Sequence, residues 1–493
     1  MLCPVCKTEY GVSDYCPECG FDDFRYEFLN KAEASLWYDS IVMPYFEEYC
    51  LRFSCQTKGR RLYRYIGIGN YDVVKIPNGI ESIGKYAFRN CNGIKEIILP
   101  NTIKVIQRYA FARQRQLCQL SIPKSVEEIE ENAFDDLDIS ISLEDGSCFH
   151  SDGHYLIDKR NDKLLWVAPK HSIPSDEPIK IIGRCSLDNI EIPQNGILNI
   201  PEGVEEIAGV IIGPFSQRRK VKAIELPQTL IRLGKNALSG LNVEDIILPR
   251  NLSYIGDFAF AGTKIKEIYV PENVSVLGKN IVGNCKNLES IAVSENNSTY
   301  YSLNNCIVDR GRCAVVASCK TSTIPTVQSI TEISEFAFWR FNGEYVIIPQ
   351  NINRISEYAF DGTGDLSVLV DANNLRYFSD KNCIIERAGN GKIIFGNDLS
   401  EIPRYVDSIA TGAFSNRDKS IIIPNNIITV GANVFSLMNQ GSDDEGNIYR
   451  WGYVFCETID KPDGWAEDWT GESEAIVLWK NDWFLDGETP CPN

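Results

Sequence analysis

The sequence predicts a repeat solenoid of short strands and turns, with inserted β-hairpins, that follows a small cysteine-rich module and a helix at the N-terminus. An apolar residue followed by proline recurs every 21 to 26 residues over much of the chain, and the same apolar positions follow each proline. Two Cys-x-x-Cys pairs stand at the start. With 493 residues and 44% hydrophobic composition, the chain can bury a core throughout, which excludes a mainly disordered protein.

Four cysteines form the N-terminal module, Cys3 with Cys6 and Cys16 with Cys19. Two thiolates on one tight turn can face the same ion, and two such turns supply the four sulfurs of a tetrahedral zinc site. Four protein ligands leave no open position, so the predicted Zn²⁺ is structural and stabilises residues 1–21, which are too few for a core. Redox-active pairs would need a βαβ context that is absent. The segment resembles short zinc ribbons at bacterial protein N-termini.

Residues 22–72 are predicted to form a helical linker and an N-terminal cap. Residues 22–50 contain no glycine and one proline, Pro44. We expect a helix with a break near Pro44, whose aromatic face packs over the first repeat. A helix on a membrane surface is the alternative, which the mixed sign of the polar side disfavours. The predicted apolar face consists of Phe24, Phe28, Ala32 and Leu36.

Counting forward from each proline gives one register. Pro77 is followed by Ile80, Ile83, Ala87 and Phe88. A fixed period of this length is typical of a solenoid, in which each unit buries its apolar face by stacking on its neighbours. The residues before each proline alternate as in a short strand, and the Phe position would place an aromatic ring between coils. Apolar residues recur at the same offsets from Pro100, Pro123, Pro201, Pro227, Pro249, Pro271, Pro349, Pro403 and Pro424.

Residues 76–91 read Ile-Pro-Asn-Gly-Ile-Glu-Ser-Ile-Gly-Lys-Tyr-Ala-Phe-Arg-Asn-Cys and resemble the BspA-type leucine-rich repeat, a bacterial and protozoan subclass. The resemblance implies protein recognition on a repeat scaffold, and many members are secreted adhesins. We expect the solenoid over residues 73–439 and a tryptophan-rich acidic cap over 440–493. Hairpins are expected near 147–170, 298–320 and 375–397, because residues 149–158, 300–309 and 377–386 are three segments of equal length.

Cys148, His150 and His154 are close enough in sequence to form a metal site. When the three hairpins are aligned, His150 falls at a strand position and His154 at a turn position. These positions explain both histidines without a metal. A role as metal ligands stays an alternative. The same alignment places Cys306 and Cys383 on a strand at the position of Tyr155, which predicts buried thiols. The residues aligned with His150 are Tyr301 and Phe378, and those aligned with His154 are Asn305 and Asn382.

Each strand before a proline has one position that points outward between two that point inward. Six of nine such positions carry large apolar residues, and stacking would align them into an exposed stripe of the kind that marks a partner site. The alternatives are that β-branched residues simply suit strands, or that another layer covers the stripe. The apolar members, our candidate partner-binding residues, are Ile98, Ile247, Tyr269, Ile347, Leu369 and Ile422; the others are Ser121, Glu225 and Ala292.

The net charge of −18, from 49 Lys and Arg against 67 Asp and Glu, disfavours binding to nucleic acid and to anionic membranes. Residues 440–493 contain thirteen acidic and three basic residues, a net charge of −10 that a basic partner could contact. We find no secretory signal and no membrane-spanning run, and the odd count of 17 cysteines favours reduced thiols, so we expect a cytoplasmic protein. Common catalytic motifs such as a P-loop are absent, so no enzyme is predicted.

These observations together predict a cytoplasmic protein-recognition scaffold. In this interpretation it is a sensor or adaptor that captures a protein, a foreign one included, and signals to a separate effector. Two alternatives remain open. One is a nucleic-acid-binding protein that uses the zinc ribbon with Arg60, Arg61 and Arg64. The other is a surface adhesin that is exported by a route not visible in the sequence.

Overall fold

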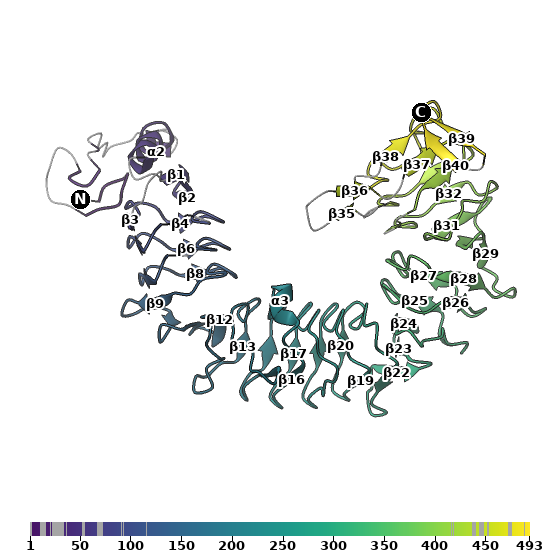
Figure 1. Ribbon diagram of the computed structural model, residues 1–493, viewed down its shortest axis with the longest axis horizontal. Coiled ribbons are helices and arrows are strands. Elements are labelled where there is room, and N and C mark those ends of the chain that lie inside the picture. The colour runs from purple at the N-terminus through teal and green to yellow at the C-terminus, as the bar shows by residue number, and fades with distance from the viewer. Residues whose placement is uncertain are drawn as a thin grey trace. The chain divides into compact units, whose positions relative to one another are not determined.

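The computed structural model describes residues 2–9, 16–19, 21, 34–35, 37–51, 55–66, 72–89, 91, 93–114, 116–415, 417, 419–435, 440–442, 448–450, 453–471, 476–487 and 489–493. It divides into two compact units, Met1–Leu230 and Ile231–Asn493. Each unit contains β-solenoid coils, which confirms the predicted fold class (Figure 1). Among the described residues we find no helix with the length and apolar character needed to cross a bilayer.

In the first unit, a π-helical turn, η1 (Tyr38–Val42), leads directly into α2 (Met43–Leu51). The predicted break at Pro44 is wrong, because this proline is the second residue of α2. The N–H of Met43 bonds to the carbonyl of Tyr38, five residues earlier. This wider turn gives the proline ring room where an α-helical carbonyl would clash. Phe24, Phe28, Ala32 and Leu36, the predicted apolar face, lie outside the described residues.

An antiparallel hairpin of β1 (Cys55–Lys58) and β2 (Arg61–Tyr65) starts the stack of coils. From β2 onward, two-residue strands pair in parallel, one from each coil: β4 (Ser82–Ile83), β6 (Val105–Ile106) and β8 (Glu128–Ile129). Their register aligns Ile83 with Ile106 and Ile106 with Ile129, which are the equivalent positions counted from each proline. A second parallel sheet contains three strands that precede prolines, β3 (Val73–Lys75), β5 (Glu96–Ile98) and β7 (Gln119–Ile122), and ends with β9 (Ser140–Leu143).

The same two kinds of parallel strand continue through both units. The first unit adds the short strands β13 (Ile181–Ile182) and β15 (Glu206–Ile207), the pair β14 (Ile197–Asn199) and β16 (Ala223–Glu225), and one helical turn, α3 (Phe215–Arg218). The short strands of the second unit are β17 (Arg232–Leu233), β18 (Tyr254–Ile255), β20 (Val276–Leu277), β25 (Glu332–Ile333), β27 (Arg354–Ile355), β32 (Ser408–Ile409) and β34 (Thr429–Val430).

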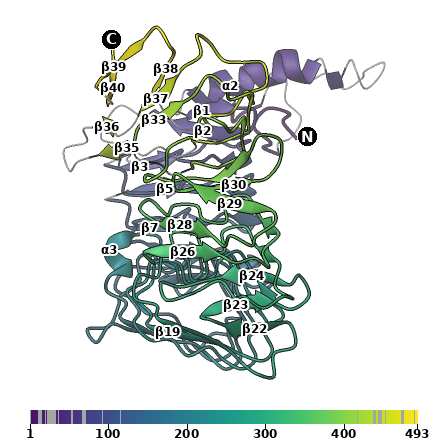
Figure 2. The same cartoon turned by 90° about the vertical axis from the view of Figure 1, so that its right-hand side faces the viewer.

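The longer strands of the second unit form separate small sheets. β26 (Tyr345–Ile348) and β28 (Ser367–Val370) lie side by side (Figure 2). The other sheets are β19 (Glu267–Val270) with β21 (Ser290–Val293), and β33 (Ile421–Ile423) with β37 (Tyr453–Cys456) and β38 (Ile476–Leu478). Two antiparallel pairs stand near the C-terminus: β35 (Gln440–Ser442) with β36 (Ile448–Arg450), and β39 (Trp483–Asp486) with β40 (Thr489–Pro492).

The three predicted hairpins are confirmed. In each, the first and last residues of the predicted segment face each other: Phe149 and Asp158, Tyr300 and Asp309, Tyr377 and Glu386. A third strand then pairs antiparallel with the hairpin and parallel with the next coil, so the insertion returns the chain to the stack. The strands are β10 (Phe149–His150), β11 (Tyr155–Asp158) and β12 (Lys163–Val167); β22 (Tyr300–Leu303), β23 (Cys306–Asp309) and β24 (Ala314–Ala317); β29 (Tyr377–Asp380), β30 (Cys383–Glu386) and β31 (Lys392–Phe395).

Phenylalanine rings from successive coils stack along the core. The rings of Phe88 and Phe111 lie 5.4 Å apart and those of Phe111 and Phe134 lie 6.0 Å apart, with planes within 14° of parallel. In the second unit, the rings of Phe414 and Phe435 are 5.9 Å apart. All five side chains are fully buried, so the predicted aromatic residue between coils is confirmed. Truncating one of these rings to alanine should cost about 3–5 kcal/mol of stability.

Candidate functional site

The four N-terminal cysteines gather into one buried cluster. The sulfurs of Cys3 and Cys19 are 3.6 Å apart, those of Cys6 and Cys16 are 3.5 Å apart, and all four lie within 4.8 Å of one another. Tetrahedral Zn²⁺ with bonds of about 2.3 Å requires sulfurs about 3.8 Å apart, so the spacing fits. None of the four residues is more than 3% exposed. Among the described residues, this is the one group of three or more His, Cys, Asp or Glu side chains close enough to share an ion.

The cysteines also interact through hydrogen bonds. Bonds from Cys19 and Cys3 to the sulfur of Cys6 lower the pKa of the Cys6 thiol. The pKa of Cys19 is raised, because its bond with Cys3 favours the protonated thiol. The hydrogen bonds therefore couple the ionisation of these thiols to one another.

Arg60, in the turn between β1 and β2, joins the cysteine cluster to the first coil. Its Nη1 donates to the carbonyl of Val5 at 2.7 Å and to the carbonyl of Gly79 at 2.9 Å. Its Nη2 donates to the carbonyl of Pro4. Pro4 and Val5 stand between Cys3 and Cys6, so one guanidinium holds the first cysteine turn against the solenoid.

Other contacts of Arg60 hold the helical segment to the same point. Nε donates to the hydroxyl of Tyr38 at 2.8 Å, and the guanidinium lies 4.8 Å from the ring centre of Phe46. The Arg60 side chain is only 9% exposed. Its Nε, Nη1 and Nη2 all donate within the protein, which counts against Arg60 as a contact in the nucleic-acid-binding alternative. Arg61 is half-buried and Arg64 is exposed.

Gly79 lets the cysteine turn approach the first coil. Its φ of +93° is in the left-handed region, and a Cβ there would lie 2.6 Å from the carbonyl oxygen of Val5. The residues at the same place after the next two prolines are Thr102 and Ser125. Glycine also stands at this place after Pro201, as Gly203, so a glycine alone did not predict this contact.

Five of the six candidate partner-binding residues lie at outward strand positions as expected, whereas Ile247 lies outside the strands of the structure. Their exposed fractions are 44% for Ile98, 85% for Ile247, 56% for Tyr269, 48% for Ile347 and 55% for Leu369, and Ile422 is half-buried. Two of them are direct neighbours, since Ile347 pairs with Leu369 in the parallel register of β26 and β28. The repeat surface therefore presents large apolar side chains that the coils do not bury.

These strands and their repeat register are those of a known family. A family model for the BspA type leucine rich repeat region matches in six copies, over residues 63–145, 212–309, 313–389 and 391–442. The chain belongs to the BspA-type leucine-rich repeat family. The match begins after the cysteine cluster, so the family accounts for the solenoid of this BspA-type protein and not for the module before it.

Three solved structures are similar to this BspA-type chain. A leucine rich cell surface protein from Faecalibacterium prausnitzii A2-165 has 17% identity and a TM-score of 0.34, over 77% of this chain and 88% of that one. The pneumococcal vaccine antigen PcpA has 14% identity and a TM-score of 0.34, over 84% and 95%. A leucine-rich repeat protein from Bacteroides ovatus ATCC 8483 has 17% identity and a TM-score of 0.34, over 72% and 79%. A comparison with curated proteins gives no match.

The hairpins of this BspA-type protein interrupt the outward stripe. In the last hairpin, Asn382 Oδ1 accepts from the N–H of Val368 at 2.9 Å, and Ser379 Oγ accepts from the N–H of Val370 at 3.1 Å. These side chains occupy the open edge of β28, so no further strand pairs there. In the second hairpin, Asn305 Oδ1 likewise accepts from the N–H of Ile291, and Ser302 Oγ accepts from the N–H of Val293, both in β21. The described apolar residues therefore form short patches rather than one continuous stripe.

All three histidines of the chain line one open hollow of about 460 Å³ beside the first hairpin. His150 Nε2 lies 3.0 Å from Glu177 Oε1, and the rings of His154 and His171 stack with centres 4.0 Å apart. Cys148 is not part of this group, because its sulfur bonds to the carbonyl of Val126. No three of these side chains among the described residues bring ligand atoms close enough for one ion.

The prediction that Cys306 and Cys383 are buried is confirmed, since neither side chain is exposed. Burial raises the pKa of each thiol to about 12. Both therefore stay protonated at neutral pH and act as core residues. The aligned Asn305 and Asn382 have φ values of +57° and +58°, which is the turn geometry expected from the alignment.

Proposed function

We propose that this protein is a cytoplasmic recognition scaffold that binds a protein partner through the outward strand residues of its solenoid. In this proposal it works as a sensor or adaptor and passes the binding event to a separate effector. The observation that carries the proposal is the exposure of Tyr269, Ile347 and Leu369 at outward positions. Large apolar groups grouped on a surface favour a partner that removes them from water.

The pair β26 and β28 offers the densest of these patches. Ile347 lies beside Leu369, and Tyr345, two residues earlier on the same face of β26, is 59% exposed. Tyrosine with aliphatic neighbours is a common centre of a protein interface, because the ring buries a large area and loses little conformational entropy. We assign this patch the central contact with the partner.

We also propose that Cys3, Cys6, Cys16 and Cys19 bind one structural Zn²⁺. The ion would link the two cysteine turns and supply the folding free energy that so short a segment lacks. The buried sulfurs and their spacing support this assignment. None of the 17 cysteines is paired in a disulfide, which supports a reducing compartment; fractionation of cells that produce the protein tests the cytoplasmic location.

The experiment is affinity capture with the full-length protein, in the cells that make it. The double variant Tyr269→Asp and Ile347→Asp places charges in two patches and should lose the protein that co-purifies with the parent chain. A matched control carries Leu375→Asp and Ile428→Asp, at side chains that are 91% and 62% exposed but lie off the outward strand positions. Both variants should match the parent in circular dichroism and thermal unfolding. Equal capture by the folded patch variant would contradict the proposal.

A further inference from the structure

The second unit contains a cavity of about 290 Å³ beside the last hairpin. Its walls come from the hairpin turn, from the chain after the hairpin, and from β33. The lining contains apolar side chains, three basic side chains, one acidic side chain and two hydroxyl groups. The lining residues are Lys381, Ser400, Glu401, Ile402, Arg404, Arg417, Ser420, Ile421, Ile422, Pro424 and Pro490.

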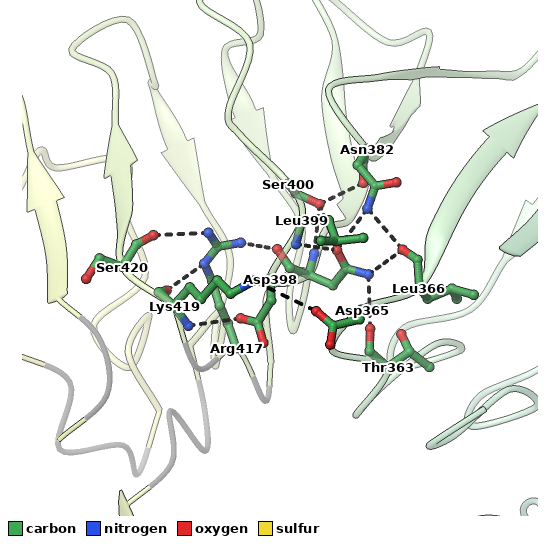
Figure 3. Close-up of polar contacts among 11 residues, drawn as sticks. Thr363, Asp365, Leu366, Asn382, Asp398, Leu399, Ser400, Arg417, Lys419 and Ser420 are labelled. Atoms are coloured by element: carbon green, nitrogen blue, oxygen red, sulfur yellow. Dashed lines mark hydrogen bonds and ion pairs between the residues drawn. The ribbon is translucent and has the colours of Figure 1, made fainter. Parts of the chain in front are cut away.

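Arg417 is the buried cation of this cavity, with a side chain at the centre of a polar network (Figure 3). The residue is only 4% exposed. Its Nε donates to the carbonyl of Lys419 at 2.8 Å, its Nη2 to the carbonyl of Ser420 at 3.0 Å, and its Nη1 to the carbonyl of Asn397. All three acceptors are neutral, so they orient the guanidinium without balancing its charge.

No carboxylate among the described residues lies within ion-pair distance of Arg417. Asp398, the nearest acid that influences it, accepts the N–H of Lys419 at 2.9 Å. Burial lowers the pKa of the Arg417 guanidinium, which is the effect of a cation held away from water. A buried charge of this kind is stabilised by an anion that enters the same space.

The other two cations of the lining already have acidic partners. Lys381 Nζ lies 2.7 Å from Glu401, and Arg404 lies 2.6 Å from Glu457. A further cation next to the network, Lys419, lies 3.8 Å from Asp365. Among the described residues of this region, Arg417 is therefore the cation without a carboxylate at ion-pair distance.

The network around Arg417 is fixed before any ligand arrives. Asn397 is 4% exposed and donates from Nδ2 to the carbonyls of Thr363 at 3.0 Å and Leu366 at 2.7 Å. Asn382, in the hairpin turn, donates to Asn397 Oδ1 at 2.9 Å. The hairpin thus holds the carbonyl that positions Arg417, as Figure 3 shows, and the cation needs little reorganisation to bind an anion.

We infer that this cavity binds a carboxylate carried on an apolar stem. The planar guanidinium of Arg417 suits a carboxylate, and Ile421 and Ile422 provide the apolar contact for the stem. A free branched organic acid and the C-terminal residue of a peptide share this chemistry. The cavity is separate from the central partner patch, since Ile347 and Tyr269 do not line it, but it shares Ile422 with the set of outward strand residues.

The test is calorimetry on the full-length protein with isocaproate and with its neutral isostere isocaproamide. Isocaproate should bind with a dissociation constant on the order of 1 mM, and the amide at least about tenfold more weakly. A second pair of probes, acetyl-Ala-Ala-Leu with a free carboxylate and the same peptide as an amide, distinguishes the sources. Tighter binding of the peptide acid assigns a peptide C-terminus, and equal or weaker binding assigns a free acid. Equal binding of acid and amide in both pairs would overturn the inference.

The variant Ile422→Glu places a competing carboxylate in the cavity and should weaken isocaproate binding at least about tenfold. The matched control is Ile347→Glu, at the same outward strand position but outside the cavity, and it should bind isocaproate like the parent. Arg417→Gln should also abolish binding. Arg417 also bonds three carbonyls, so Arg417→Gln is informative only if it folds. The decisive variant is therefore Ile422→Glu. Full binding by folded Ile422→Glu would refute the site.

Discussion

The guanidinium of Arg60 donates a hydrogen bond to the carbonyl of Val5, across 55 residues of sequence, at 2.7 Å. The same guanidinium bonds to Gly79 in the first coil and to Tyr38 in the helical segment. Three parts of the N-terminal region therefore share one cation. In the first unit, the cysteine module is a packed end piece of the solenoid.

Replacing Arg60 should weaken the packing of the cysteine module against the first coil. Arg60→Ala leaves the carbonyls of Pro4, Val5 and Gly79 without their charged donor, at a cost of about 2–4 kcal/mol. Hydrogen exchange should show lost protection at the N-terminal coils, while the second unit keeps its own. Arg64→Ala, at an exposed side chain nearby, is the control and should exchange like the parent. Unchanged protection in Arg60→Ala would mean that these bonds do not hold the module.

Metal analysis should give one zinc per chain. Cys3→Ser should reduce this to none and lower the thermal stability of the first unit, because the four sulfurs act as one closed site. The control is Cys491→Ser, at a half-buried thiol outside the cluster, and it should retain the metal. Two ions in the parent, or metal retained by Cys3→Ser, would instead indicate a metal site at the hollow that contains His150, His154 and His171.

A buried asparagine should be essential for the last hairpin. Asn374 donates to the carbonyls of Pro349 and Ile352 and accepts from the N–H groups of Arg376 and Tyr377. Asn374→Ala removes all four bonds at a site that is 2% exposed, and should cost about 3 kcal/mol in the unfolding of the second unit. Its exposed neighbour supplies the control, Asn373→Ala, which we expect to stay within about 0.5 kcal/mol of the parent.

The parts of this protein that sequence analysis predicted depend on local spacing. Ile83, Ile106 and Ile129 stack because each stands six residues after a proline, and the coil period follows from that count. The cysteine cluster likewise needs only two tight turns. The hairpin segments were visible as equal lengths, and their end residues pair as expected.

Contacts between distant residues were beyond the sequence. Arg60 was considered as a nucleic-acid contact, because nothing local shows that its donors reach back to Pro4 and Val5. Arg417 gave no signal, since one of the three carbonyls that it bonds, that of Asn397, comes from 20 residues earlier in the chain. The break expected at Pro44 failed because a π-helical turn before it relieves the usual clash.

Asp188 should make the stability of the first unit depend on pH. Burial raises the pKa of this carboxyl to about 7, against 3.8 for an exposed aspartate, although the N–H of Gly213 donates to it. The fold therefore favours the protonated form. The stabilising contribution of Asp188 to the free energy of unfolding is fully present below pH 3.8 and is lost as the pH rises through about 7.

Asp188→Asn removes the charge and keeps an acceptor for Gly213, at the loss of the 3.3 Å bond that Asn132 Nδ2 donates to the other carboxyl oxygen. We expect it to raise the free energy of unfolding of the first unit by about 2–4 kcal/mol at about pH 8 and to have little effect near pH 4. Urea unfolding across this pH range is the measurement. Asp145→Asn, at an exposed carboxylate, should leave the curve of stability against pH unchanged. A variant at Asp188 that is less stable than the parent at pH 8 would show that the carboxylate is stabilised by the fold, contrary to the effect of burial.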